Sequence, residues 1–176
     1  MKEIVLIVGG CRSGKSRHAL EMAEERGGKT NVFMATCIPH DEEMRQRVAR
    51  HQAERSPLWK TEEVPLALPK AIRHWSKRCD VILVDCLTLW TSNLLMESDE
   101  PEGIEMEIQQ LALALEGSRC PVVLVSNEVG CGIVPENPLA RQFRDFSGFC
   151  NQAVAAVADR VVWMVAGIPV AVKPGP

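Results

Sequence analysis

The residues best suited to chemistry follow the first apolar segment and read Gly9-Gly10-Cys11-Arg12-Ser13-Gly14-Lys15-Ser16. They match the pattern G-x-x-x-x-G-K-[ST] of a phosphate-binding loop, or P-loop. Glycines let the backbone curl so that its N–H groups converge on one phosphate, and the next helix directs its positive end there. In this pattern Lys15 reaches the β- and γ-phosphates and Ser16 binds Mg²⁺. The alternative is a glycine turn without a ligand, which the position between a strand and a helix disfavours.

A second candidate for phosphate chemistry is Asp85, which follows the apolar run Val-Ile-Leu-Val at residues 81–84. P-loop enzymes place an acid for Mg²⁺ at the end of another buried strand, so Asp85 is a candidate metal ligand, directly or through water. The alternative role is to cap the helix that follows, which the same position also favours.

A histidine between two arginines lies on residues 41–55, a polar segment expected to form an exposed helix. Arg47, His51 and Arg55 are four residues apart and share one face of such a helix. The guanidinium groups disfavour the charged imidazole, so His51 would be a neutral nucleophile beside two phosphate-binding side chains. The spacing is equally typical of a solvated basic face with an ordinary histidine, and alone it favours that interpretation.

A fourth candidate is residues 124–138, where an apolar strand leads into a loop that contains Asn127, Glu128, Gly130 and Gly132. Loops at the carboxyl ends of parallel strands are the usual ligand sites of α/β folds. Polar residues continue on the next expected helix, namely Arg141, Arg144, Asp145, Asn151 and Gln152. The alternative is a long connection with helix caps and surface ion pairs.

Apolar runs that alternate with amphipathic segments must position these residues. Strands are expected over residues 3–8, 31–35, 81–84, 122–125, 161–165 and 170–172. Helices are expected over residues 16–26, 41–55, 66–78, 87–96, 104–116 and 138–157, with a charged loop at 97–103. The alternation predicts an α/β fold, a mostly parallel sheet with helices on both faces. We expect one P-loop NTPase-like (RecA-like) domain over residues 1–176.

The composition excludes several other classes of protein. Apolar residues make up 46% and charged residues 24%, which is typical of a soluble globular chain. The net charge of -3 gives no general attraction for nucleic acid or membrane, and no apolar run reaches the roughly 18 residues of a transmembrane helix. Seven cysteines without a C-x-x-C pair indicate reduced thiols in a cytoplasmic protein rather than a zinc site or disulfide framework.

The motifs together resemble the bifunctional adenosylcobinamide kinase / adenosylcobinamide-phosphate guanylyltransferase family of cobalamin biosynthesis. The resemblance continues in order from the P-loop through residues 34–36, 41–48, His51, 59–63 and 85–88. Its most specific part is Ser-Asn-Glu-Val-Gly-Cys-Gly-Ile-Val-Pro-Glu-Asn at residues 126–137, with residues 140–145 and 148–152 behind it. It therefore covers nearly the whole chain.

The resemblance implies two reactions at one P-loop. ATP or GTP phosphorylates the aminopropanol hydroxyl of adenosylcobinamide, with Lys15 and Mg²⁺ assisting. GTP then transfers GMP through a histidine to the phosphorylated corrinoid, giving adenosylcobinamide-GDP. His51 matches the family's guanylylated histidine, which reverses the interpretation that its spacing favours alone. The family also implies a homotrimer.

The resemblance also implies a set of nucleotide contacts beyond the P-loop and Asp85. These match Ala35, Thr36, Cys37, Gln52, Ala53, Glu54, Arg55 and Glu63. A carboxylate at Glu63 suits the N1 and N2 protons of guanine. Cys11 stands where alanine is more common, and Cys37 and residues 52–54 also depart from the family's pattern, so the contacts there rest on position alone.

Two other functions fit parts of the sequence. A P-loop kinase for another small molecule would use Lys15 and Asp85 and would form no nucleotidyl-enzyme. A nucleotide-gated binding module of the recombinase type would need a basic patch or a partner domain, which the acidic balance opposes.

Overall fold

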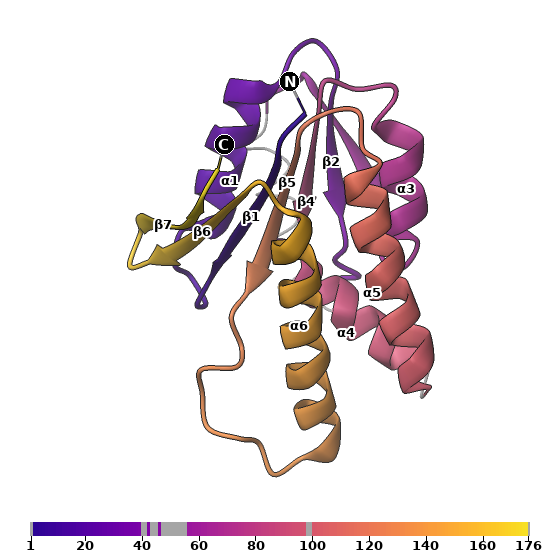
Figure 1. Cartoon of the computed structure of the whole chain (residues 1–176), viewed down its shortest axis with the longest axis vertical. Helices are drawn as coiled ribbons and strands as arrows, with labels where there is room; N and C mark the ends of the chain where they lie inside the picture. The colour runs from indigo at the N-terminus through magenta and orange to yellow at the C-terminus, as the bar shows by residue number, and fades with distance from the viewer. Residues whose placement is uncertain (1, 40–41, 43–45, 47–55, 98–99, 176) are drawn as a thin grey trace.

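The strands of the protein form one sheet (Figure 1). The computed structural model describes residues 2–39, 42, 46, 56–97 and 100–175. Its strands are β1 (Ile4–Gly9), β2 (Asn31–Ala35), β3 (Trp59–Glu63), β4 (Val81–Asp85), β5 (Val122–Asn127), β6 (Arg160–Val165) and β7 (Ile168–Pro174). The order across the sheet is β3-β2-β4-β5-β1-β6-β7. The first six in this order are parallel, whereas β7 pairs antiparallel with β6.

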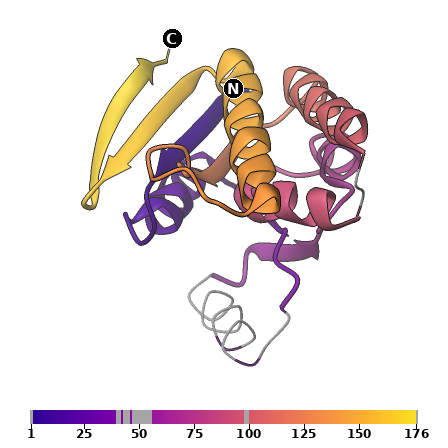
Figure 2. The ribbon, with the colours of Figure 1, turned by 90° about the horizontal axis from the view of Figure 1, so that it is seen from below.

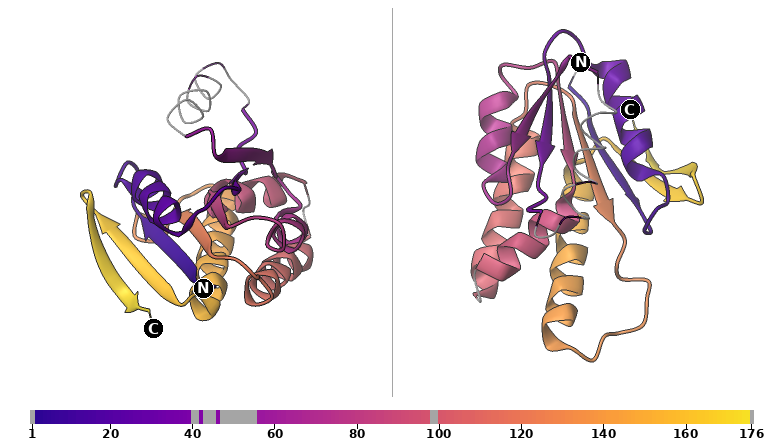
Figure 3. Two further views of the ribbon diagram at one scale, coloured as in Figure 1. Left: turned by 90° about the horizontal axis from the view of Figure 1, so that it is seen from above. Right: turned by 180° about the vertical axis from the view of Figure 1, so that it is seen from behind.

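Helices cover both faces of the sheet (Figure 2 and Figure 3). They are α1 (Lys15–Arg26), α3 (Leu68–Trp75), α4 (Leu87–Glu97), α5 (Pro101–Glu116) and α6 (Pro138–Val157). Successive side chains of a strand point to opposite faces. Val5 and Ile7 of β1 therefore pack with α1, while Ile4 and Leu6 belong to the larger core under α3 to α6.

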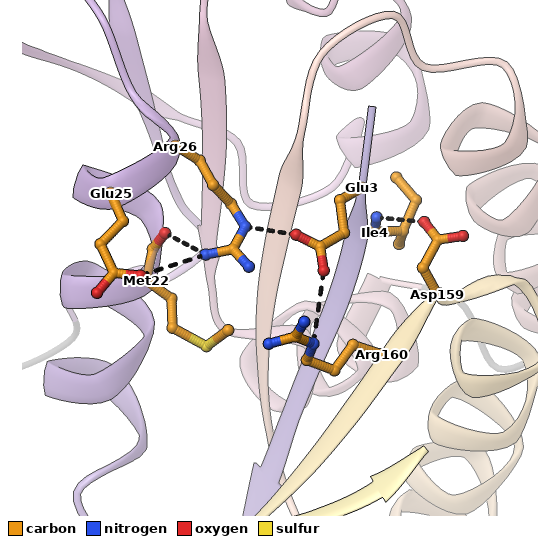
Figure 4. A network of polar contacts seen from close by, with 7 residues as sticks. All are labelled: Glu3, Ile4, Met22, Glu25, Arg26, Asp159 and Arg160. Carbon is orange, nitrogen blue, oxygen red and sulfur yellow. Dashed lines mark hydrogen bonds and ion pairs between the residues drawn. The ribbon is translucent and has the colours of Figure 1, made fainter. Parts of the chain in front are cut away.

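Charged residues fasten the amino end of β1 to its neighbours (Figure 4). Arg26 Nε of α1 donates to Glu3 Oε2 over 2.6 Å, and the backbone N–H of Ile4 donates to Asp159 Oδ2 over 2.7 Å. Arg160 Nε lies 3.5 Å from Glu3 Oε1, at ion-pair distance but without a hydrogen bond. These contacts lie at the opposite end of β1 from the P-loop. They therefore hold the strand in place and take no part in the chemistry of the P-loop.

The α/β fold predicted from the alternation is confirmed, but several elements differ from the prediction. Strand β3 was not expected, because only Trp59 of its five residues is buried and Lys60, Thr61, Glu62 and Glu63 give it no apolar run. It forms the sheet edge beside β2.

The other differences concern where elements begin and end. Helix α5 starts at Pro101 instead of residue 104, because proline suits the first helical turn, so the expected loop at 97–103 is shorter. Helix α3 covers Leu68–Trp75 rather than residues 66–78, and β7 extends to Pro174. Of the helix expected over residues 41–55, only Glu42 and Gln46 lie among the described residues.

All seven cysteines are free thiols, and Cys11 and Cys131 are exposed. In the part of the chain that the structure describes, no helix is both long and apolar enough to cross a membrane.

Candidate functional site

Parallel pairing brings the candidate residues from distant parts of the chain to one edge of the sheet. Gly9 of β1 is the register partner of Asn127 of β5, and Ala35 of β2 pairs with both Glu63 of β3 and Asp85 of β4. These positions are the carboxyl ends of their strands. The carboxyl edge of a parallel sheet is where α/β folds bind ligands, so the structure assembles one candidate site there.

The P-loop curls between β1 and α1 around the side chain of Lys15. Arg12 has a φ of 54° and Gly14, which precedes the helix, has a φ of 92°. Lys15 Nζ donates to the carbonyl of Gly10 over 2.5 Å and to Ser13 Oγ over 3.4 Å. The loop thus holds its cation at the centre of its own curve, where a phosphate group would meet it.

Lys15 is buried, with 7% of its surface exposed. Burial lowers the pKa of its ammonium group from the ordinary value of 10.5, because desolvation penalises the charged form. The side chains of Cys86, Cys11 and Asp85 offset part of this shift. These side chains compensate only part of the cost of burying the ammonium group. A bound phosphate would supply further negative charge beside it.

The turn between β6 and β7 supports the P-loop from one side. The backbone N–H of Gly167 donates to the carbonyl of Ser13 over 3.1 Å. A Cβ atom on Gly9 would lie 2.6 Å from the carbonyl oxygen of Met164, so this position needs glycine. The sequence reasoning missed the contribution of Gly167, although its position in a glycine-containing turn between two apolar runs was visible.

Thr36 joins the ends of β2 and β4. Its buried hydroxyl donates to the carbonyl of Cys86 over 2.7 Å and accepts from the Cys86 N–H over 2.8 Å. The peptide bond between Asp85 and Cys86 is cis. Asn93 Nδ2 of α4 donates to the carbonyl of Thr36 over 2.8 Å. The predicted site residue Thr36 therefore fixes the backbone beside Asp85, and Asn93 is a positioning residue that the sequence reasoning missed.

Ser16 and Asp85 have the chemistry for a magnesium ion. Ser16 is half-buried in the first turn of α1, and Asp85 ends β4 close enough to act electrostatically on Lys15. A hydroxyl and a carboxylate are hard oxygen ligands, and Mg²⁺ on a nucleotide usually takes only one or two protein ligands. In the part of the chain that the structure describes, no three or more His, Cys, Asp or Glu side chains group together to hold a metal ion.

The end of β5 is tied to both the P-loop and α4. The backbone N–H of Glu128 donates to the carbonyl of Gly9 over 3.0 Å, and that of Asn127 donates to Thr88 Oγ1 over 2.7 Å. Glu128 Oε1 accepts from the N–H of Gly130 over 2.6 Å. The loop candidate at residues 124–138 thus begins in direct contact with the P-loop.

The remaining predicted residues are placed as follows. Cys11 and Arg12 are exposed on the P-loop, Cys37 is half-buried after β2, and Glu63 is exposed at the end of β3. His51, Gln52, Ala53, Glu54 and Arg55, together with Arg47, lie outside the described residues. The geometry of the site therefore covers the P-loop and the strand ends.

The sequence of this chain matches the model of a known protein family. The model described as CobU, cobinamide kinase / cobinamide phosphate guanyltransferase, matches residues 5–172. The chain belongs to this family. The two named activities, phosphoryl transfer to cobinamide and guanylyl transfer to cobinamide phosphate, both require a nucleoside triphosphate, which agrees with the P-loop at the carboxyl edge.

Curated relatives of the CobU family match this chain over nearly its full length. The bifunctional adenosylcobalamin biosynthesis protein CobP of Pseudomonas aeruginosa is 42% identical over 171 residues, which cover 97% of this chain and 98% of CobP. The bifunctional adenosylcobalamin biosynthesis protein CobU of Salmonella typhimurium is 41% identical over 184 residues, covering 97% of this chain and 99% of the relative. The resemblance inferred from the motifs is thereby confirmed.

Solved structures share the fold of this CobU family member at low sequence identity. The flagellar accessory protein FlaH from Methanocaldococcus jannaschii superposes with a TM-score of 0.55 and 12% identity, covering 98% of this chain and 79% of FlaH. A second solved structure, an ATPase domain, gives a TM-score of 0.51 and 12% identity, covering 92% of this chain and 69% of that domain. Both likenesses support the P-loop NTPase-like fold and nothing about the substrate.

Proposed function

We propose that this chain, as a single nucleotide-binding domain, phosphorylates adenosylcobinamide with ATP or GTP and then attaches GMP to the product through His51. The observation that carries the proposal is the buried Lys15 at the centre of the P-loop, at the same sheet edge as Asp85. Family membership gives the substrate class, and the geometry of the P-loop supports the proposal of one triphosphate site.

The nucleotide would be held in three parts. The backbone N–H groups of the P-loop and Lys15 would bind the β- and γ-phosphates. Strand-end residues Ala35, Thr36 and Cys37 would line the site beside β2, and Glu63 would accept the guanine N1 and N2 protons. Gln52, Ala53, Glu54 and Arg55 are assigned here from the family resemblance.

Ser16 and Asp85 would hold Mg²⁺, which lowers the cost of bringing negative charge together on the transferring phosphate. In the kinase step the substrate hydroxyl oxygen forms a bond to the γ-phosphorus, and the bridging bond to the β-phosphate breaks. The products are a phosphate ester, the nucleoside diphosphate and the hydroxyl proton. Lys15 stabilises the charge that moves onto the β-phosphate oxygens.

The guanylyl transfer occurs in two displacements at the α-phosphorus of GTP. A ring nitrogen of His51 forms the P–N bond while the bond to the β-phosphate oxygen breaks and pyrophosphate leaves. A phosphate oxygen of the corrinoid ester then attacks the same phosphorus, which forms the diphosphate bond and releases the histidine. Arg47 and Arg55 would offset the phosphate charge in both displacements.

Labelling tests this proposal. GTP labelled at the α-phosphate should leave an acid-labile label on the wild type without any corrinoid, whereas γ-labelled GTP should not. His51→Ala should lose the label, and His74→Ala is the matched control, because His74 is exposed on α3. An unlabelled wild type would support a P-loop kinase without a nucleotidyl-enzyme. Equal labelling of His51→Ala would remove the assigned role of that residue.

We propose further that the protein is a cytoplasmic homotrimer. Its free thiols fit a reducing compartment. Trp163, Val165, Ile168 and Val170 form adjacent pairs on the β6–β7 hairpin and are between 44% and 65% exposed, an apolar face that a second copy would cover. Light scattering should give the mass of a trimer. Trp163→Glu should lower this mass, whereas Met106→Glu should not, because Met106 is exposed on α5, away from the hairpin.

A further inference from the structure

One face of α6 carries buried polar atoms that lack hydrogen-bond partners. Among the described residues such atoms are Arg144 Nη1, Ser147 Oγ, Asn151 Oδ1 and, away from this helix, Arg160 Nε. Residues 144, 147 and 151 are three and four positions apart and therefore share one side of the helix. Ser147 is 2% exposed, so its hydroxyl is shielded from bulk water. Buried polar groups without partners destabilise a fold, so three in one row require an explanation.

This row, Arg144, Ser147 and Asn151, is connected to the P-loop through β5 and its loop. Asn151 Nδ2 donates to the carbonyl of Asn127 over 3.2 Å, and Asn127 is the register partner of Gly9. Arg144 Nη2 donates to the carbonyl of Gly130 over 2.5 Å. Arg144 and Asn151 thus each use one nitrogen to hold a backbone carbonyl of this segment, while Arg144 Nη1, Asn151 Oδ1 and the Ser147 hydroxyl are left without a protein partner.

The surroundings of the row suit a substrate larger than a nucleotide. The loop from β5 to α6 extends past the carboxyl edge of the sheet, alongside the first half of α6 (Figure 1). Ile133 and Val134 of this loop are 97% and 62% exposed. The loop that Arg144 holds at Gly130 therefore also carries exposed apolar side chains, which a substrate with apolar parts could contact.

We propose that the Arg144–Ser147–Asn151 row binds the arm of the corrinoid that carries the reacting hydroxyl. This inference rests on the proposed function, which requires that arm to reach the P-loop first as an alcohol and then as a phosphate ester. Ser147 and Asn151 contact the amide and hydroxyl groups of the arm. Arg144 Nη1 contacts the phosphate ester, because a guanidinium prefers a phosphate to a neutral group.

Ser147→Ala gives the sharpest test. The substitution removes a hydroxyl that has no protein partner, so the melting temperature should stay equal or rise. The KM for adenosylcobinamide phosphate should increase by about threefold to tenfold, which corresponds to one lost hydrogen bond. An unchanged KM for adenosylcobinamide phosphate would overturn the proposal, whatever the melting temperature of the variant.

Arg144→Met extends the test to the charge. Its KM for adenosylcobinamide phosphate should increase by about tenfold or more, and by less for adenosylcobinamide, which has no phosphate. Arg141→Met is the matched control, because Arg141 is exposed on the same helix and donates to the carbonyls of Pro135 and Glu136. Equal effects of the two variants would make Arg144 a support of the loop and would overturn its assigned contact.

Self-labelling by α-labelled GTP separates this inference from the proposed function. Both variants should form the guanylylated enzyme at the wild-type level, because that step needs no corrinoid. If the wild type itself takes no label, the guanylylation mechanism fails. If labelling is normal and the corrinoid KM values of Ser147→Ala and Arg144→Met equal those of the wild type, only the assignment of this row fails.

Discussion

The backbone N–H of Gly167 donates to the backbone carbonyl of Ser13 over 3.1 Å, which fastens the β6–β7 turn to the P-loop. Gly167 has a φ of 85°, and a Cβ on Gly14 would lie 3.5 Å from its Cα. The turn and the loop therefore pack backbone against backbone. A segment near the end of the chain thus helps to set the shape of a loop near its beginning.

We expect Gly167→Ala to weaken nucleotide binding. Alanine at a positive φ costs about 1 kcal/mol of stability, and the turn would shift to relieve this strain. The Ser13 contact should lengthen, and the Kd for GTP, measured by calorimetry, should rise several-fold. Gly175→Ala is the control, since Gly175 has a φ of 88° but lies beside Arg160. Equal Kd values for both variants would show that the turn does not support the P-loop.

Thr36 makes a second testable contact, because its hydroxyl bonds to both backbone groups of Cys86. Thr36→Val should lower the free energy of unfolding by about 2–3 kcal/mol, since a buried N–H and a buried carbonyl would lose their partner. Thr91→Val is the matched control. Thr91 is also buried, but its hydroxyl donates to the carbonyl of Leu87 within its own helix and bridges no two strand ends, so a smaller loss is expected in urea unfolding.

The thiols should differ in their rates of alkylation. Burial raises the pKa of Cys86 to about 11 and that of Cys150 to about 12. The thiolate is the reactive form, so both should stay protonated and unreactive at pH 8, where the exposed Cys11 and Cys131 react first. Mass spectrometry should show that GTP protects Cys11 and leaves Cys131 accessible. Early labelling of Cys86 or Cys150 in the folded protein would contradict the burial described here.

The sequence predicted those parts of the site that are local in the chain. The P-loop was readable because eight consecutive residues contain its glycines, lysine and serine, and β1, β2, β4 and β5 were readable as apolar runs. Strand β3 was not predicted, because an edge strand needs few buried residues and so gives no apolar run in the sequence. The contacts Thr36–Cys86 and Gly167–Ser13 join residues far apart in the chain. One sequence without structure gives no signal for such pairs. Arg144 and Asn151 were visible as polar residues of the expected helix, but Ser147 and the missing hydrogen-bond partners of the α6 row were not.

Lys15→Ala should weaken both reactions. The β- and γ-phosphates must be held in each, and the structure places one buried ammonium group within the P-loop curve. We expect at least tenfold lower kcat/KM for phosphorylation and for guanylyl transfer, on the order of one lost charged hydrogen bond. A normal kinase rate with impaired guanylylation would instead indicate separate nucleotide sites.

The lowered pKa of Lys15 predicts how nucleotide affinity depends on pH. Burial favours the neutral amine in the free protein, whereas a bound triphosphate favours the ammonium form, so binding raises the pKa and takes up a proton. The affinity for nucleotide should therefore fall as the pH rises through the pKa of Lys15 in the free protein, which lies below the ordinary value of 10.5.

Calorimetry with a non-hydrolysable GTP analogue from pH 7.5 upwards measures this dependence, in a Cys11→Ala background that removes the nearby thiol. Lys15→Ala in the same background should bind more weakly and show a flatter profile, because no ammonium remains to titrate. Parallel profiles for the two proteins would mean that another group governs the pH dependence.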